Sequence, residues 1–144
     1  MWGDCSRMTR AAKRRAWYPW RMTDPNCIFC KIVAGEIQAE KVYEDDTYLA
    51  FLDIRPLSPG HTLIIPKAHE RWVWDVADLG GYFGVARKIA KALQKISGTD
   101  EVHMKVVGEE IPHAHVWVYP ASDKAHGKKS DLPANAAALR AALA

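Results

Sequence analysis

The chain has 144 residues, 49% of them hydrophobic and 26% charged, and a formal net charge of +3. These values are typical of one globular domain, and no segment approaches the roughly 18 consecutive apolar residues that a membrane helix requires. Three cysteines without a secretory signal favour a reducing compartment over a disulfide scaffold. We therefore expect a cytoplasmic protein with no membrane partner.

The first 21 residues differ from the rest in charge. They carry six Lys or Arg residues against the single acid Asp4, so the remaining chain has a net charge of −2. We expect residues 1–21 to be a disordered basic extension and residues 22–144 to form one domain. A transit peptide or an arm that contacts nucleic acid are the alternatives. Nucleic acid is a disfavoured partner, because the positive charge lies outside the domain.

The spacing of apolar residues predicts the elements of this domain. Alternation with period two indicates strands, and apolar residues three and four apart indicate helices. Gly35, Pro66 and Gly98 mark three of the expected ends. The predicted order is a helix over 27–34, strands over 41–44, 47–53 and 61–66, a long helix over 75–97, strands over 101–107 and 114–119, and a terminal helix after Asp131. This order predicts an α+β fold, a five-stranded antiparallel sheet with its helices on one side.

The most informative segment is Ile111–Pro120. Polar or aromatic residues alternate there with small apolar ones, so His113, His115 and Trp117 share one face of a strand. Two imidazoles on one face are an unusual way to fill a core, because imidazole favours partial hydration or a partner. A pair of surface histidines on a half-exposed strand is the alternative interpretation.

This segment resembles the histidine-triad (HIT) signature, His-x-His-x-His, with Trp117 in the place of the third histidine. The resemblance extends to Cys27–Ile37, Leu49–Ile54 and Pro59–His69, which match the family in order and spacing. It is closest in kind to the Hint-like branch. Family membership implies a homodimer in which the long helices and the fourth strands meet across a two-fold axis, so that the sheet is continuous.

The resemblance also implies a reaction. His115 holds the position of the family's nucleophile, which cleaves a nucleoside monophosphate from a phosphoramidate or phosphoanhydride through a nucleotidyl-histidine. The chain is therefore expected to be a nucleotide hydrolase or transferase. Trp117 departs from the pattern, because an indole N–H donates a hydrogen bond but cannot accept one or shuttle a proton. The alternative is a catalytically impaired nucleotide-binding or regulatory protein.

The same resemblance assigns a binding site for a purine nucleotide. Asp53 is expected to accept hydrogen bonds from the ribose hydroxyls, with a strand-terminal acid that faces water as the alternative. Gly108 is expected to line the site, and Trp117 to contact a phosphate oxygen, stack against the base or block the site. After Gly108 come Glu109 and Glu110, where many relatives carry Gln-Ser, and two inward carboxylates there would repel an anionic substrate. The expected apolar slot for the base consists of Ile28, Phe29, Ile32, Ile37, Phe51, Leu52 and Ile54.

Cys27 and Cys30 form a second constellation. Two thiols at C-x-x-C spacing are half of a zinc site and lack two ligands, which His69 and His113 are available to supply. Several relatives with this cysteine pair carry such a metal, so the resemblance implies one structural zinc per chain. Two buried thiols with ordinary packing are the alternative.

Overall fold

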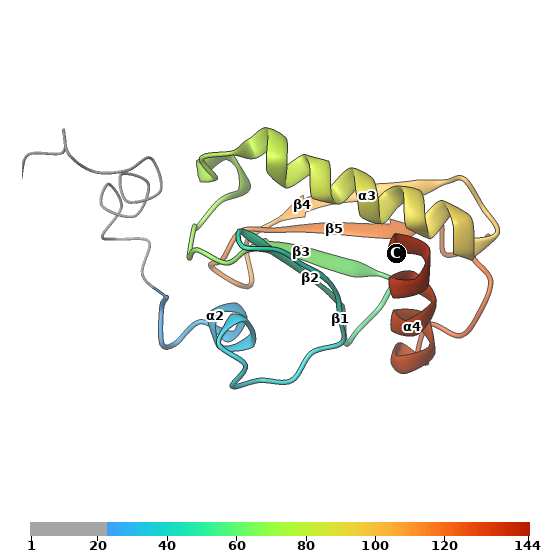
Figure 1. The fold of residues 1–144 in the computed structure, drawn as a ribbon, viewed down its shortest axis with the longest axis horizontal. Coiled ribbons are helices and arrows are strands. Elements are labelled where there is room, and N and C mark those ends of the chain that lie inside the picture. The colour runs from blue at the N-terminus through green and yellow to red at the C-terminus, as the bar shows by residue number, and fades with distance from the viewer. Residues whose placement is uncertain (1–22) are drawn as a thin grey trace, which may run out of the picture.

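The computed structural model describes residues 23–144, so the predicted basic extension over 1–21 lies outside the described residues. The domain is shown in Figure 1. Its elements are α2 (Ile28–Val33), β1 (Lys41–Glu44), β2 (Tyr48–Leu52), β3 (Thr62–Pro66), the 3-10 turn η2 (Val73–Asp75), α3 (Leu79–Ser97), β4 (Val102–Val107), β5 (His115–Pro120) and α4 (Leu132–Leu143).

The strands form one five-stranded antiparallel sheet in the order β1-β2-β3-β5-β4, which confirms the predicted α+β class. The β1–β2 hairpin is held by Asp45, whose Oδ1 accepts hydrogen bonds from Thr47 N and Tyr48 N at 2.7 Å each. An acidic side chain that bonds the backbone two and three residues on is a common way to close a turn. The strand that carries the histidines, β5, lies between β3 and the edge strand β4.

Both faces of the central strands are buried. Ala50, Ile64 and Val116 lie in one apolar cluster with residues of α3 and α4. Phe51 and Leu63, with Trp117 packed against them, belong to a second cluster that includes residues of α2. Figure 1 shows α2 and α3 on opposite sides of the sheet. The prediction that all helices lie on one side is therefore wrong for α2, because successive residues of β2 are apolar and each face needs a cover.

The long helix begins later than its apolar pattern predicts. Asp78 is the N-cap, and its Oδ1 accepts a hydrogen bond from Gly81 N at 2.9 Å, which separates α3 from the preceding 3-10 turn. Gly98 ends the helix in a left-handed conformation, with φ of 76°. None of the described helices combines the length and apolar content needed to cross a membrane.

The last helix is tied to the first strand. Asp131 caps α4 as predicted, accepting a hydrogen bond from Ala134 N at 3.2 Å. Near the other end of α4, Arg140 Nε donates to Lys41 O at 2.7 Å, and its Nη2 lies 3.2 Å from a carboxylate oxygen of Glu40. These contacts join α4 to the start of β1, although the two segments are about a hundred residues apart in the sequence.

Candidate functional site

The face of the sheet covered by α2 carries the histidines. His115 opens β5, and Trp117 follows on the same face. Phe29 of α2 packs edge-on against both imidazoles, with its ring centroid 5.8 Å from that of His113 and 5.2 Å from that of His115. Both histidines are buried, so the alternative of two surface histidines is excluded.

His115 is held in one tautomer. Its Nδ1 lies 2.7 Å from the backbone oxygen of His113. A carbonyl oxygen only accepts hydrogen bonds, so Nδ1 carries the proton and Nε2 carries the lone pair. Burial lowers the pKa of His115, and the hydrogen bond to the His113 carbonyl opposes that shift only in part. The ring is therefore neutral at pH 7, with a nucleophilic nitrogen at Nε2.

Next to His115, four side chains form a compact donor cluster. The ligand atoms of Cys27, Cys30, His69 and His113 all lie within 4.8 Å of one another. His113 Nδ1 is 3.4 Å from Cys27 Sγ, and His69 Nδ1 is 3.2 Å from Cys30 Sγ. The helix α2 brings the two thiols to the sheet, and residues far along the chain supply the imidazoles.

The protonation states of this cluster suit a metal ion. His113 Nε2 donates to Pro66 O at 2.8 Å, so its Nδ1 lone pair points at the sulfurs. Burial lowers the pKa of His113 to about 4, which keeps the ring neutral. Burial also raises the pKa of the Cys30 thiol to about 11, and a bound cation would reverse that shift by favouring the thiolate. Two sulfurs and two imidazole nitrogens are the donor set of a tetrahedral zinc site.

Asp53 lies just beyond the end of β2, beside a histidine to which the sequence assigns no role. Asp53 Oδ1 accepts from Arg55 N at 2.8 Å, and its Oδ2 lies 3.9 Å from His61 Nε2. His61 Nδ1 accepts from Leu57 N at 3.1 Å, so its proton is on Nε2. That buried Nε2 has no hydrogen-bond partner among residues 23–144. A free donor therefore faces the Asp53 carboxylate from within the core.

Trp117 lies between these two parts of the site. Its ring packs edge-on against His61, with centroids 4.9 Å apart, and Lys105 Nζ of the neighbouring strand is 5.4 Å from the ring centre. The indole is only partly buried. A large amphipathic ring with a cation above it thus occupies the position where the signature has its third histidine.

The turn at Gly108 packs against Arg71 and Trp72, for which the sequence predicts no role. Arg71 Nη1 donates to Gly108 O at 2.5 Å, and the Arg71 guanidinium lies 3.9 Å from the centre of the Trp72 ring. A Cβ atom at position 108 would lie 2.5 Å from Trp72 Cζ3, so any side chain there would require the Trp72 ring to shift. Glu109 turns back on the same loop and accepts from Gly108 N at 3.1 Å, an interaction that lowers the pKa of Glu109.

The structure brings together only part of the predicted base slot. Phe29, Ile32 and Phe51 are buried in the cluster beneath α2, and Ile37 packs against it. Ile28 is exposed at the surface of α2, and Ile54 is 77% exposed just past β2. The assignment of Leu52 to the slot is wrong. Leu52 belongs to the apolar cluster on the opposite face of the sheet, because neighbouring residues of a strand point to opposite sides.

Comparisons with known proteins agree with this geometry. A family model of the HIT domain matches residues 34–124. The chain is 40% identical over 109 residues to Protein hit of Bacillus subtilis, a match that covers 71% of this chain and 75% of that protein. It is 37% identical over 116 residues to an adenosine 5′-monophosphoramidase of Saccharomyces cerevisiae, covering 77% and 72% of the two chains. Among solved structures, a zinc-bound histidine triad family protein from Mycobacterium smegmatis superposes with a TM-score of 0.70 at 32% identity, over 82% of this chain and 93% of that one.

Proposed function

The chain belongs to the HIT domain family, and on that premise we propose that it is a nucleotide hydrolase or transferase with His115 as its nucleophile. The observation that carries the proposal is the hydrogen bond from His115 Nδ1 to the His113 carbonyl, which leaves Nε2 unprotonated. The match to a yeast adenosine 5′-monophosphoramidase supports the same class of reaction.

The reaction divides one displacement into two. In the first step, His115 Nε2 forms a bond to the phosphorus of a nucleoside monophosphate group, the bond from phosphorus to the leaving group breaks, and the leaving group takes up a proton from solvent. In the second, water attacks that phosphorus, the nitrogen–phosphorus bond breaks, and the monophosphate departs as His115 regains its neutral form. The proton of the attacking water passes to solvent, since the indole of Trp117 cannot accept it.

His115→Ala should reduce turnover of an adenosine phosphoramidate by about three orders of magnitude or more, because an essential covalent step is removed. Nucleotide affinity and the melting temperature should change little, since the smaller side chain leaves the slot intact. Steady-state kinetics and calorimetric titration with adenosine monophosphate measure the two effects. The exposed histidine His126 provides the matched control, as His126→Ala should turn over at the wild-type rate.

Mass spectrometry of the wild-type protein mixed with the phosphoramidate separates the enzyme from the alternative function. An added adenylyl mass on the peptide that contains His115 is the expected result. Trp117, large and held between His61 and Lys105, is the feature that favours the alternative. A protein that binds nucleotide without adduct or turnover would be a catalytically impaired nucleotide-binding protein, and His115 would not be a nucleophile.

We further propose that the nucleotide is a purine ribonucleotide, with its base near Phe29, Ile32 and Phe51 and its ribose at Asp53. The apolar cluster beneath α2 supports the base position. Asp53 is partly exposed at the end of β2 and has one carboxylate oxygen without a close partner, His61 Nε2 being 3.9 Å away. That oxygen is available to a pair of vicinal hydroxyls. Gly108 and Trp117 would then flank the phosphate.

Asp53→Ala should weaken adenosine monophosphate about tenfold, the cost of one or two lost hydrogen bonds to a charged group. The 2′-deoxy analogue should lose clearly less, because it offers one hydroxyl fewer. Dissociation constants for both ligands, measured on wild-type and variant protein, provide this comparison. Asp46→Ala, at an exposed turn position, controls for the change in net charge. If both ligands lost the same affinity, Asp53 would not bind the ribose 2′-hydroxyl and the proposed role would be wrong.

Cys27, Cys30, His69 and His113 would hold one structural zinc ion per chain. The support is the clustering of their donor atoms, the orientation of His113 Nδ1 by Pro66 O, and the existence of a zinc-bound family member of similar fold. When bound, zinc supplies a covalent-strength link between α2 and the sheet. Four protein ligands fill a tetrahedral shell, so the metal would have no open position for substrate.

Protein purified without added metal should contain about one zinc per chain, and Cys30→Ser should lose most of it while lowering the melting temperature by several degrees. Inductively coupled plasma mass spectrometry and thermal denaturation measure the two effects. Cys5→Ser makes the same change outside the cluster and should affect neither quantity. A wild-type zinc content near zero, with no stabilisation by added zinc, would show that these four residues do not form a zinc site and only pack in the core.

We propose that the protein is a homodimer with a continuous sheet. The strand β4 is a sheet edge, with Met104 45% and Val106 43% exposed, and exposed apolar edges favour pairing with another strand. Light scattering should give twice the mass of one chain, and Met104→Glu with Val106→Glu should give the monomer. A wild-type monomer at micromolar concentration would contradict the proposal.

A further inference from the structure

The outer side of α3 has an unusual charge distribution. Arg87, Lys88, Lys91 and Lys95 are all exposed, and the helix contains no acidic residue. Lys91 lies four residues from Arg87, three from Lys88 and four from Lys95, separations at which like charges repel and weaken a helix. Residues 22–144 as a whole carry a net charge of −2, so these cations are not the by-product of a basic domain.

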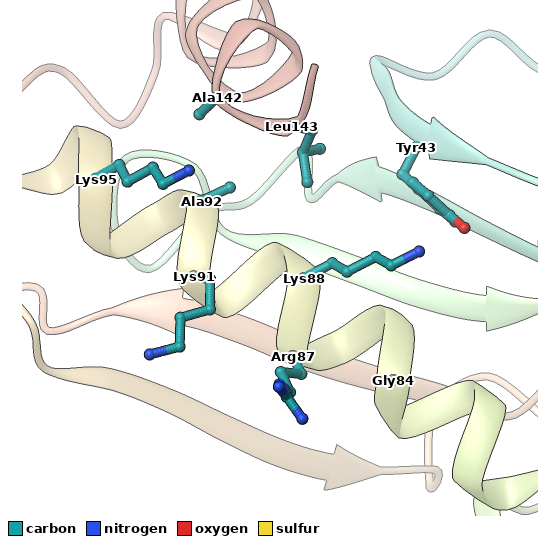
Figure 2. A pocket seen from close by; sticks show the side chains of 9 residues that line it. All are labelled: Tyr43, Gly84, Arg87, Lys88, Lys91, Ala92, Lys95, Ala142 and Leu143. Atoms are coloured by element: carbon teal, nitrogen blue, oxygen red, sulfur yellow. The ribbon is translucent and has the colours of Figure 1, made fainter.

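The cations border a groove between α3, α4 and β1 (Figure 2). Its volume is about 590 Å³, within the range of small-molecule sites. Ala92, Ala142 and Leu143 provide small apolar surface, and Tyr43 lies at the far end. Lys88 and Lys95 extend along the groove toward Tyr43 and α4, whereas Arg87 and Lys91 project from the other side of the helix.

Among the described residues, none of these four cations has a counter-ion. Across residues 23–144, the ion pairs engage Lys41, Lys67, Lys124 and Arg140 but none of the four cations of α3. Lys88 Nζ lies 5.4 Å from the centre of the Tyr43 ring, which orients the ammonium group without neutralising it. A concave, uncompensated positive surface raises the local concentration of anions.

We propose that this groove binds a small ligand that carries several phosphate groups. Lys88 and Lys95 are two helical turns apart, a rise of about 10 Å, which suits a linear chain of phosphates better than one isolated anion. Ammonium groups bind phosphate oxygens through charge-assisted hydrogen bonds. The apolar residues between them leave room for a non-polar part of the ligand. The groove lies on the α3 face of the sheet, opposite His115, so the proposal does not depend on the proposed function.

The shape of the groove favours a small ligand over a polymer. α4 borders the groove along one side and Tyr43 lies at its end, whereas single-stranded nucleic acid needs a longer basic track with several free aromatic faces. Tyr43, the only aromatic residue in the lining, already faces Lys88. Oligonucleotides and acidic peptides therefore serve as competing probes in the test.

Inorganic tripolyphosphate is the probe, because it lacks the base and ribose that the His115 site would recognise. Isothermal titration of the full chain should give a dissociation constant that rises about tenfold or more in Lys88→Gln with Lys95→Gln, which removes two charge-assisted hydrogen bonds. Lys128→Gln with Lys129→Gln makes the same charge change at exposed positions outside the groove and should bind like wild type. Residues 1–22 are present in every variant, so their basic charge cancels in the comparison.

Circular dichroism and the melting temperature establish that each variant is folded, and neutralising like charges on α3 should not lower either. In an NMR titration, amide shifts should move around Tyr43, Ala92 and Ala142. Equal weakening in the groove and control variants would show general charge attraction and overturn the proposal. It would also be overturned if His115→Ala abolished tripolyphosphate binding, or if an oligonucleotide or acidic peptide bound the wild type more tightly than tripolyphosphate.

Discussion

The structure depends on the way His113 is held. Its ring Nε2 donates to Pro66 O at the end of β3, its Nδ1 faces the two thiols from α2, and its backbone carbonyl accepts the Nδ1 proton of His115. One residue thereby links β3, β5 and α2 and also fixes the tautomer of its neighbour. The donor cluster and the reactive nitrogen are consequently parts of one hydrogen-bonded unit.

The sheet separates two kinds of surface. On the α2 face, imidazoles, thiols and an indole lie among Phe29, Phe51 and Leu63, and they are mostly buried. On the α3 face, the sheet is covered mainly by apolar packing, and the charged groups of α3 lie on the outside of the helix. Electrostatic interactions are stronger in the buried environment, because water does not screen them. The nucleophilic role proposed for His115 would use that buried environment, whereas the groove of α3 remains in contact with solvent.

Much of the fold follows from local patterns in the sequence. The alternation from Ile111 to Pro120 correctly predicts that His115 and Trp117 share a face, and the apolar spacing predicts α3 apart from its first turn. The apolar pattern, which starts at Val76, predicts too early a start for α3, because Asp78 caps the helix and it begins at Leu79. The side of the sheet that α2 covers could not be predicted in this way, since every residue of β2 is buried and the pattern favours neither face.

Contacts between residues that are far apart in the chain could not be predicted from local sequence patterns. The proximity of Asp53 to His61 depends on the register between β2 and β3. The face to which Leu52 points depends on which residues of β2 face α3, and this cannot be inferred from a strand in which every residue is apolar or buried. Arg71 and Trp72 reach Gly108 across more than thirty residues. The sequence shows that Lys88, Lys91 and Lys95 are spaced three and four residues apart on α3. It does not show the groove beside them, because the groove also needs Tyr43 and Leu143, which are about a hundred residues apart.

The contact between Arg140 and the carbonyl of Lys41 can form only after α4 has been synthesised, so this part of the fold is completed late. The hairpins β1–β2 and β2–β3 join neighbouring segments and can form early during synthesis, since short loops close fast. β5 must then insert between β3 and β4, and α4 can dock only after it has itself been synthesised, last among the described elements. Until then, β1 and the part of α3 that packs against α4 lack their cover. A nascent chain of this protein therefore exposes apolar surface for most of its translation, the period in which chaperones bind and aggregation competes with folding.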